Sequence, residues 1–374
     1  MTGGVVLWYN RQNSLLAKKL GRDNMQYKRK DSILSMVEVP DCITAEYYDS
    51  VDMFTVASIW QLSYRDISNH KIEISTEEEL SGLCFNTETV FPKNLQELAD
   101  KVLEEGKSHR LNTCGLTGKG VKVAVIDRPF NSDHVEFAGR VEYIEVYPGH
   151  PHYEDPEFHG TVCAGFLSGA TCGVAPESEL VYFVIPWESD VEVYYEHQLE
   201  ALRKILAYNQ THDSRIRIVS LSAGFTKSQL EQRSELEKQL AETGCALIDA
   251  VNFQRNFKGI DCVTSNGKTS YELNRWQIDN YEMHKDRPGF KEYFNSLCFV
   301  PSSRRTSPGF DSDTEYVHWS KAVSESWTIP QVAGAYACAL QVNPDLRYEE
   351  FISKSKQCQR KDGFIIFDLK TILE

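Results

Sequence analysis

The chain has 374 residues, of which 41% are hydrophobic and 25% are charged, and its formal net charge at pH 7 is −14. This length suggests two domains and is ample for a sizeable core. The negative charge argues against nucleic acid and anionic membrane surfaces as partners, because both require basic patches. No apolar run approaches the roughly 20 residues of a membrane span, so we expect no membrane contact.

The start of the chain and its cysteines predict a cellular compartment. The first ten residues lack a basic segment and have only a short apolar core, so we expect no secretory signal. The ten cysteines are scattered, without a Cys-x-x-Cys pair or the spacing of metal ligands. We therefore expect reduced thiols, no cofactor, no metal and a cytoplasmic location.

Residues 1–112 are predicted to form a small α+β N-terminal domain. Strand candidates lie at 5–9, 33–39 and 70–75, and residues 56–62 fit either a strand or a helix. The clearest helix spans 94–105, with Gly106 as its end. This part of the chain contains no chemical motif. The glycine-rich stretch 106–120 marks the boundary to a second domain, residues 113–374.

The second domain alternates strands with helices, which is typical of βαβ units around a parallel sheet. The β-branched run 121–127 predicts a strand buried on both faces. Further strands are predicted at 180–186, 216–221 and 246–251, and helices at 159–170, 194–208 and 228–243. Residues 253–323 predict irregular hairpins and loops, and residues 348–374 predict one helix and a short strand at 364–367. The expected fold is α/β, a parallel sheet with helices on both faces.

Residues 324–344 predict a helix that is buried on all sides. After Pro330 the stretch is apolar on every face and rich in alanine. Ser326 lies at its start, where free backbone N–H groups and the helix dipole can stabilise an oxyanion. The alternative interpretation is that Ser326 only caps the helix.

Three more polar residues stand at the ends of predicted buried elements. Asp127 and Asn252 end strands, and His159 begins a helix of small residues. Acyl transfer needs a hydroxyl that attacks, an imidazole that takes its proton and a carboxylate that orients the imidazole. The order Asp127, His159, Ser326 is that of subtilisin, and Asn252 can offer an amide to the oxyanion. Taken singly, Asp127 also fits a turn and His159 a structural helix start.

The segments around these residues resemble the motifs of the subtilisin-like serine peptidases, the subtilase family, between residues 116 and 345. The matching segments are 118–127 for the acid, 159–165 for the histidine, 173–176, 220–222, and 326–334 for the serine. The resemblance implies a subtilisin-like fold with Ser326 as nucleophile, His159 as general base and Asp127 as the orienting acid. It also implies Asn252 as oxyanion donor, and a substrate strand bound along five residues: Ser220, Leu221, Ser222, Ala223 and Gly224.

The chain departs from the family pattern next to the proposed catalytic residues. Ser324 and Glu325 replace the usual Gly-Thr before the nucleophile, and Glu325 places a negative charge beside the developing oxyanion. Arg128 follows the acid, and Val251 stands where a glycine usually precedes Asn252. These changes bear on rate and specificity.

We therefore expect an intracellular serine endopeptidase that acts on protein or peptide substrates through an acyl-enzyme. The alternative is a slow or inactive subtilase-fold protein with a binding or regulatory role. The N-terminal domain is either a pro-domain that folds against the cleft and is removed, or a permanent domain that contacts the cleft or a partner protein. The acidic loop 188–192 either favours a basic residue in the substrate or is merely solvated.

Overall fold

The computed structural model describes residues 38–50, 60–108, 111–153, 156–188 and 190–374. The strand expected at 5–9 lies outside these residues, as do most of the segments 33–39 and 56–62. Within the described ranges, no helix has the length and apolarity needed to cross a membrane.

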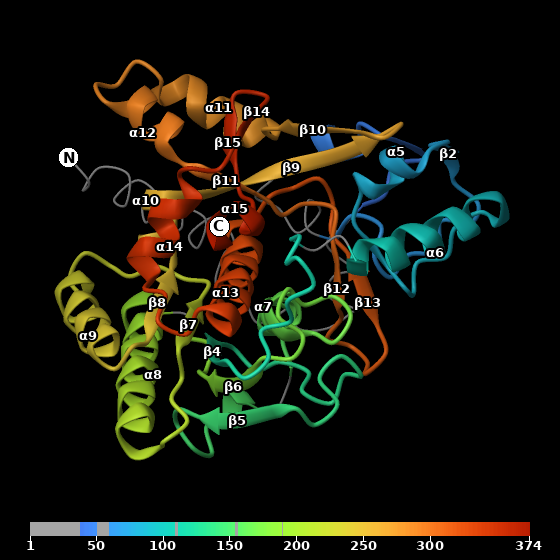
Figure 1. Ribbon diagram of the computed structural model, residues 1–374. Coiled ribbons are helices and arrows are strands. Elements are labelled where there is room, and N and C mark those ends of the chain that lie inside the picture. The colour runs from blue at the N-terminus through green and yellow to red at the C-terminus, as the bar shows by residue number, and fades with distance from the viewer. Residues whose placement is uncertain (1–37, 51–59, 109–110, 154–155, 189) are drawn as a thin grey trace.

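A five-stranded parallel sheet forms the centre of the second domain (Figure 1). Its strands are β4 (Lys122–Asp127), β5 (Val141–Glu145), β6 (Glu179–Val184), β7 (Ile218–Leu221) and β8 (Ala246–Asp249). Their order is β5-β6-β4-β7-β8, and every neighbouring pair is parallel. Because β4 lies between β6 and β7, its β-branched residues are buried on both faces, as its sequence predicts.

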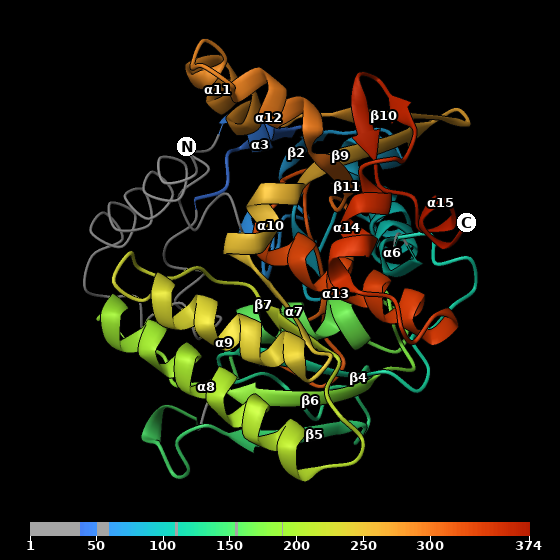
Figure 2. The same ribbon diagram turned by 60° about the vertical axis from the view of Figure 1, so that its left-hand side comes forward.

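Helices cover both faces of this sheet, which confirms the expected α/β fold (Figure 2). The helices α7 (Phe158–Ser168) and α13 (Glu325–Val342) pack on one face, and α8 (Val191–Thr211) and α9 (Leu230–Glu242) pack on the other. Successive residues of a strand point to opposite faces. Val123 and Val125 accordingly join the core of α7 and α13, whereas Ala124 and Ile126 join the core of α8 and α9.

The expectation of irregular hairpins and loops at 253–323 is only partly correct: β9 (Phe257–Ser265) and β10 (Lys268–Glu272) form an antiparallel hairpin, but they belong to a regular second sheet. This sheet has the order β10-β9-β11-β15-β14 and also contains β11 (Cys298–Pro301), β14 (Arg360–Lys361) and β15 (Phe364–Ile366). The remaining helices here are α10 (Ala250–Asn256), α11 (Arg275–His284), α12 (Phe290–Ser296), α14 (Tyr348–Ser355) and α15 (Leu369–Leu373). A small separate core joins β9, β11, β15 and α12 and contains few residues from each, too few to produce a periodic pattern in the sequence.

The N-terminal part is a small α+β unit with a core of its own. It contains β1 (Cys42–Thr44), α3 (Tyr47–Ser50), β2 (Lys71–Glu73), α5 (Glu77–Ser81), β3 (Phe85–Asn86) and α6 (Lys93–Ser108). The predicted strand at 70–75 and helix at 94–105 correspond to β2 and α6. Gly106 does not end α6 as expected. A Cβ there would lie 2.3 Å from Thr306 Oγ1, so this glycine permits close packing against the rest of the chain.

This unit shares a sheet with the rest of the molecule. Strand β3 pairs with β13 (Tyr316–His318), which pairs in turn with β12 (Thr306–Pro308). The amide of Asn86 donates to Glu315 Oε1 at 2.8 Å. Trp60, which is 1% exposed, packs against Phe158 at the start of α7 and against Trp319, with ring centroids 5.2 and 5.6 Å apart. The N-terminal unit therefore contacts the segments that lead into both α7 and α13.

Candidate active site

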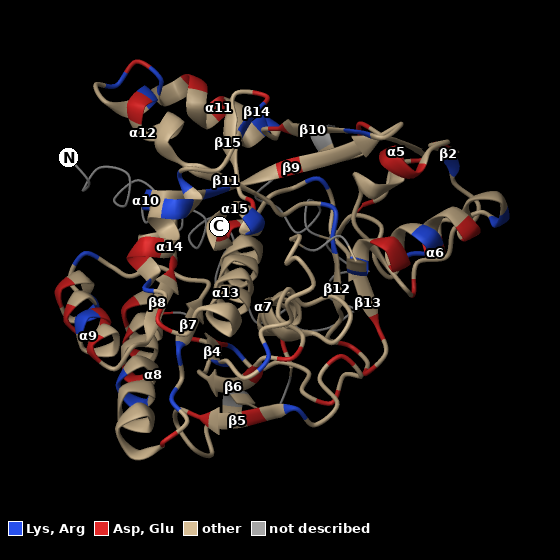
Figure 3. Cartoon of the chain, in the orientation of Figure 1, with Lys and Arg blue, Asp and Glu red and all other residues tan. Residues whose placement is uncertain are grey.

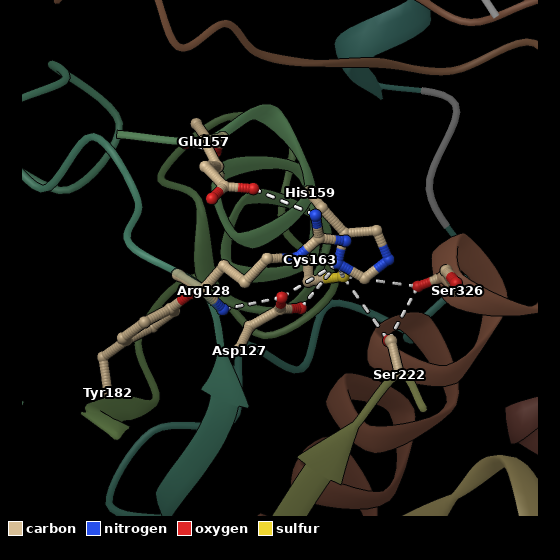
Figure 4. Close-up of polar contacts among 9 residues, drawn as sticks. Asp127, Arg128, Glu157, His159, Cys163, Tyr182, Ser222 and Ser326 are labelled. Carbon is tan, nitrogen blue, oxygen red and sulfur yellow. Dashed lines mark hydrogen bonds and ion pairs between the residues drawn. The ribbon is translucent and has the colours of Figure 1, made fainter. Parts of the chain in front are cut away.

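Asp127 and His159 are joined by a hydrogen bond at the carboxyl end of the central sheet (Figure 4). Asp127 is the last residue of β4 and is 3% exposed. Nδ1 of His159, on the first turn of α7, lies 2.9 and 2.8 Å from the two oxygens of the Asp127 carboxylate. Because Nδ1 donates to the carboxylate, Nε2 of a neutral imidazole is an acceptor.

Asp127 stays ionised in spite of its burial. Burial alone would raise its pKa, but the charge and hydrogen bond of His159 and the nearby Arg128 outweigh this effect and lower the pKa below its ordinary value. The backbone N–H of Arg128 also donates to Asp127 Oδ1 at 2.8 Å. A carboxylate in this state can hold the imidazole in one tautomer.

Ser326 lies in the first turn of α13, next to this pair. The N-cap of α13 is Ser324, so the alternative interpretation of Ser326 as the cap does not hold. The backbone carbonyl of Ser326 accepts hydrogen bonds from Ser222 Oγ at 2.9 Å and from Cys163 Sγ at 3.5 Å. Cys163 Sγ also lies 3.9 Å from His159 Nδ1. Figure 4 shows the His159 imidazole between the Asp127 carboxylate and the start of α13.

Aromatic side chains enclose the imidazole. The Trp327 ring, directly after Ser326, lies 5.3 Å from that of His159, and it also packs against Trp319 at 5.2 Å. These contacts extend to Trp60 of the N-terminal unit. Sequence patterns did not indicate this cluster, because its members come from segments far apart in the chain.

Asn252 points away from the other three residues. It is the third residue of α10 instead of the end of a strand, because the Asp249 side chain caps α10 by accepting from Asn252 N at 2.9 Å. The side-chain amide of Asn252 donates to Glu237 Oε1 at 2.5 Å and to the Leu247 carbonyl at 2.9 Å. Glu237 belongs to α9, on the face of the sheet opposite α7 and α13. Both amide hydrogens are thus engaged, and in this conformation neither can reach an oxyanion beside Ser326.

The expected substrate segment is only partly available. Ser220 and Leu221 lie inside β7, where Ser220 pairs with both β4 and β8 and Leu221 pairs with β8. No free strand edge remains at Ser220, whereas Leu221 is paired on one side only. Ser222, Ala223 and Gly224 extend beyond the sheet and are partly exposed, so they are the part of the segment that can contact an extended peptide.

Glu325, the unusual residue before Ser326, has partners that the sequence did not indicate. Its carboxylate accepts from Gln254 Nε2 at 2.8 Å. Burial raises its pKa, and the charge of Lys258 together with the Gln254 hydrogen bond opposes that rise only in part. The negative charge expected beside the oxyanion is therefore offset by a cation and an amide from α10 and β9.

Arg128, the unusual residue after Asp127, contacts several elements. Its Nη1 lies 2.9 Å from Glu157 Oε2, and its guanidinium lies over the Trp187 ring at 4.7 Å. The Tyr182 hydroxyl donates to the Arg128 carbonyl. These contacts hold the backbone that follows Asp127.

Among the described residues, the cluster with metal-ligand spacing is Asp127, His159 and Cys163, whose ligand atoms lie within 4.8 Å of one another. Burial, followed by the charge of Asp127, raises the pKa of Cys163 well above its ordinary value. Since metals bind the thiolate and Asp127 already holds His159, these residues do not fit a metal ion.

Comparisons with known proteins agree with this geometry. The model described as "Subtilase family" matches residues 118–285, a segment that includes Asp127 and His159. Subtilisin-like protease PopC of Myxococcus xanthus is 37% identical over 76 residues, which cover 18% of this chain and 16% of that protein. Subtilisin-like protease 8 of Arthroderma otae is 31% identical over 108 residues, which cover 29% and 22%. Residues 118–285 are therefore similar to the subtilase family.

The chain spans less than a quarter of the length of these two curated relatives. Among solved structures, it is similar to fervidolysin from Fervidobacterium pennivorans, described as a keratinolytic enzyme related to subtilisin. The TM-score is 0.48 and the identity 14%, over 69% of this chain and 43% of that one. A likeness at this level adds nothing to the fold described above.

Proposed function

We propose that this chain is a serine peptidase that cleaves peptide bonds in protein or peptide substrates. The observation that carries the proposal is the hydrogen bond between Asp127 and His159 Nδ1, 2.8 Å long, beside the helix start that holds Ser326. The match of residues 118–285 to the subtilase family supports it. The proposal assigns the nucleophile to Ser326, the base to His159 and the orienting acid to Asp127.

Each step then uses a group of this chain. His159 Nε2 takes the proton of Ser326 Oγ while that oxygen attacks the peptide carbonyl carbon. The negative charge that develops on the carbonyl oxygen lies at the start of α13, where the backbone N–H of Ser326 can donate to it. His159 passes its proton to the leaving amine and later accepts one from the water that hydrolyses the acyl-enzyme.

A fluorophosphonate probe tests this assignment, because it labels a serine hydroxyl only when a neighbouring base activates it. We expect labelling of the full chain, loss of labelling in Ser326→Ala, and retention in the matched control Ser324→Ala, which changes the N-cap two residues earlier. A folded wild-type chain that remains unlabelled would rule out the proposal.

The second candidate is a subtilase-fold binding protein with little turnover. The position of Asn252 favours it, because an oxyanion donor that is bonded to Glu237 gives no help to the transition state. This candidate predicts that a peptide substrate binds to the unlabelled protein and can be recovered uncleaved.

We also propose that the N-terminal unit is a permanent part of the enzyme and not a removable pro-domain. The pairing of β3 with β13 and the burial of Trp60 against Phe158 and Trp319 support this. Removal of the unit would expose an unpaired strand edge and several apolar side chains next to the catalytic helices.

We also propose that the protein is located in a reducing, intracellular compartment. All ten cysteines are free thiols in the structure, and nine of them are buried or partly buried: Cys42, Cys84, Cys163, Cys172, Cys245, Cys262, Cys298, Cys338 and Cys358. Alkylation of the protein as it is taken from its cell, followed by intact-mass measurement, should give ten adducts. Fewer adducts without prior reduction would contradict this location.

The acidic loop 188–192 gives little support to a preference for basic substrates. The Asp190 side chain caps α8 by accepting from Glu192 N at 2.9 Å. The Glu192 carboxylate accepts from Thr226 Oγ1 and Ser228 Oγ at 3.1 and 3.2 Å. Since these carboxylates already have structural partners, we assign no charge preference to the substrate site.

A further inference from the structure

A large cleft separates the N-terminal unit from the second sheet. Its volume is about 1030 Å³, and its walls come from α5, α6, β9, β10 and the segment that leads to β12. Asp127, His159 and Ser326 are not among its lining residues. Whatever occupies this cleft is therefore bound outside the catalytic site.

Arg305 lies in the wall of this cleft without a counter-charge. It is 5% exposed, and its Nη2 donates to the Pro301 carbonyl at 2.6 Å. Its Nε has no hydrogen-bond partner, and none of the described carboxylates forms an ion pair with it. The adjacent Arg304 shows the contrast, because its Nε and Nη2 lie 2.9 and 3.1 Å from the two oxygens of Asp261.

A buried guanidinium without an anion is costly, because it loses its hydration and gains no compensating charge. Burial lowers the pKa of Arg305 to about 9, which reflects the same lack of compensation. The remaining N–H groups of such a side chain form a flat donor edge that matches the two oxygens of a carboxylate. The Arg305 guanidinium can therefore bind an anion that enters through the cleft.

The opposite wall of the cleft is acidic. It includes Glu77 and Glu78 of α5 and Glu105 of α6, and Figure 3 shows acidic positions on both helices. Glu77 and Glu105 pair with Lys101 at 2.5 and 3.5 Å, so one lysine faces three carboxylates and the wall keeps a net negative charge. Such a wall repels a dianionic phosphate but favours an ammonium or amide N–H on the same ligand. The ligand class that fits both walls carries one carboxylate and a positive or hydrogen-bond-donating group.

We propose that this cleft binds an amino acid or a short peptide with a free C-terminus, whose carboxylate is held by Arg305. The acidic side chains of α5 and α6 face the amine or amide end of the ligand. Because the binding site excludes the proposed catalytic residues, this inference does not depend on the peptidase activity.

The test measures binding by calorimetry to the full chain carrying Ser326→Ala, so that no peptide is cleaved. The probes are the tripeptide Lys-Ala-Ala as free acid, its C-terminal amide, free lysine and inorganic phosphate. We expect the free acid to bind at least tenfold more tightly than the amide or phosphate, and Arg305→Met to abolish this difference. Arg217→Met is the matched control, because Arg217 also donates to carbonyl groups but lies outside the cleft.

Free lysine separates the two sources of the carboxylate. Binding of lysine as tightly as the tripeptide assigns the cleft to amino acids, and weaker binding of lysine assigns it to peptides. Equal binding of the free acid and the amide, or tighter binding of phosphate, would overturn the proposal.

A second readout does not require a folded Arg305 variant. Cys262 lines the same cleft and is partly exposed, whereas Cys114 is exposed and lies outside it. Saturating free-acid tripeptide should slow the alkylation of Cys262 by iodoacetamide and leave Cys114 unchanged. Unchanged alkylation of Cys262 would refute binding in this cleft.

Arg305→Met should also keep or raise the melting temperature of the chain. If Arg305 had a purely structural role, its replacement would lower the melting temperature.

Discussion

At the residue level, the rate of the proposed peptidase reaction depends on the direction in which one side-chain amide points. Asn252 donates both of its side-chain hydrogens away from Ser326, to Glu237 and to the Leu247 carbonyl. Oxyanion donors of this kind contribute roughly 10²–10³ in kcat when they are in place. A chain with the Asp127–His159 pair formed but this donor absent should be active and slow.

The first prediction is that Glu237→Ala raises kcat, by about tenfold on a peptide substrate. Without its Glu237 partner, the amide of Asn252 is free to turn toward the oxyanion. Adding Asn252→Ala to this variant should remove the gain, and Glu235→Ala, an exposed change on the same helix, should have no effect. If Asn252→Ala alone lowers wild-type kcat by about 10²-fold, the wild-type amide already serves the oxyanion and the prediction fails.

The second prediction concerns Glu325 and the dependence of stability on pH. Burial raises the pKa of this carboxyl in the folded state above its unfolded value. A carboxyl with a raised folded pKa destabilises the fold as pH rises through that pKa, because the folded state must then bury the charge. Glu325→Gln keeps a hydrogen-bond acceptor for Gln254 and removes the titration.

Urea unfolding at pH 4, 5.5 and 7 measures this effect. The free energy of unfolding of Glu325→Gln, relative to wild type, should increase from pH 4 to pH 7. Lys258 and Tyr293 are the titratable groups that face Glu325, so both remain unchanged in the comparison. The exposed change Glu272→Gln on β10 should show no such trend. A difference that shrinks with rising pH would mean that Glu325 stabilises the fold as an ion.

At the level of elements, an aromatic cluster connects the N-terminal unit to α7 and α13, the helices that hold His159 and Ser326. Trp60 contacts Phe158, which precedes His159, and Trp319, which contacts Trp327 after Ser326. The indole of Trp60 is fully enclosed, so its removal leaves a cavity that these rings cannot fill without moving.

The third prediction is that Trp60→Ala lowers the free energy of unfolding by about 3–5 kcal/mol. It should also reduce fluorophosphonate labelling at temperatures where the variant remains folded, because Trp327 and Phe158 lose their support. Trp276→Ala, a partly exposed tryptophan on α11, is the control and should cost about 1 kcal/mol. A loss of stability with unchanged labelling would show that the aromatic cluster stabilises the fold but does not affect the reactivity of Ser326.

Sequence patterns predicted best the elements whose own composition identifies them. The β-branched run of β4 and the small apolar residues of α13 each identify a buried element without reference to any partner. By contrast, the predicted strand at 246–251 ends at Asp249, where a helix cap takes over. Of the second sheet, the strand at 364–367 was predicted and corresponds to β15. The sheet itself was not predicted, because its strands pair through contacts between distant parts of the chain.

The candidate site could be predicted only as far as residue types and chain order allowed. Those signals pointed to Asp127, His159 and Ser326, which the fold gathers into one cluster. They could not give the direction of the Asn252 amide, which depends on Glu237, or the partners of Glu325, which come from α10 and β9. The orientation of these side chains depends on residues far away in the chain, which a local sequence pattern does not include.

At the level of the whole molecule, the N-terminal unit and the rest of the chain form one connected body through the sheet β12-β13-β3. The fourth prediction is that the full chain keeps its intact mass during prolonged incubation. A fragment ending near residues 106–116 should not be released. Release of such a fragment by wild type, but not by Ser326→Ala, would identify the unit as a pro-domain.

The pairing of β3 with β13 also has a consequence for how the protein is made. Asn86 and Glu315, whose side chains meet beside this pairing, are separated by 229 positions in the chain. At a ribosomal rate of about 5–20 residues per second, the early strand waits for tens of seconds before its partner is synthesised. During that interval the nascent polypeptide exposes an open β-edge, and chaperones that shield such edges should determine how much active protein a cell obtains.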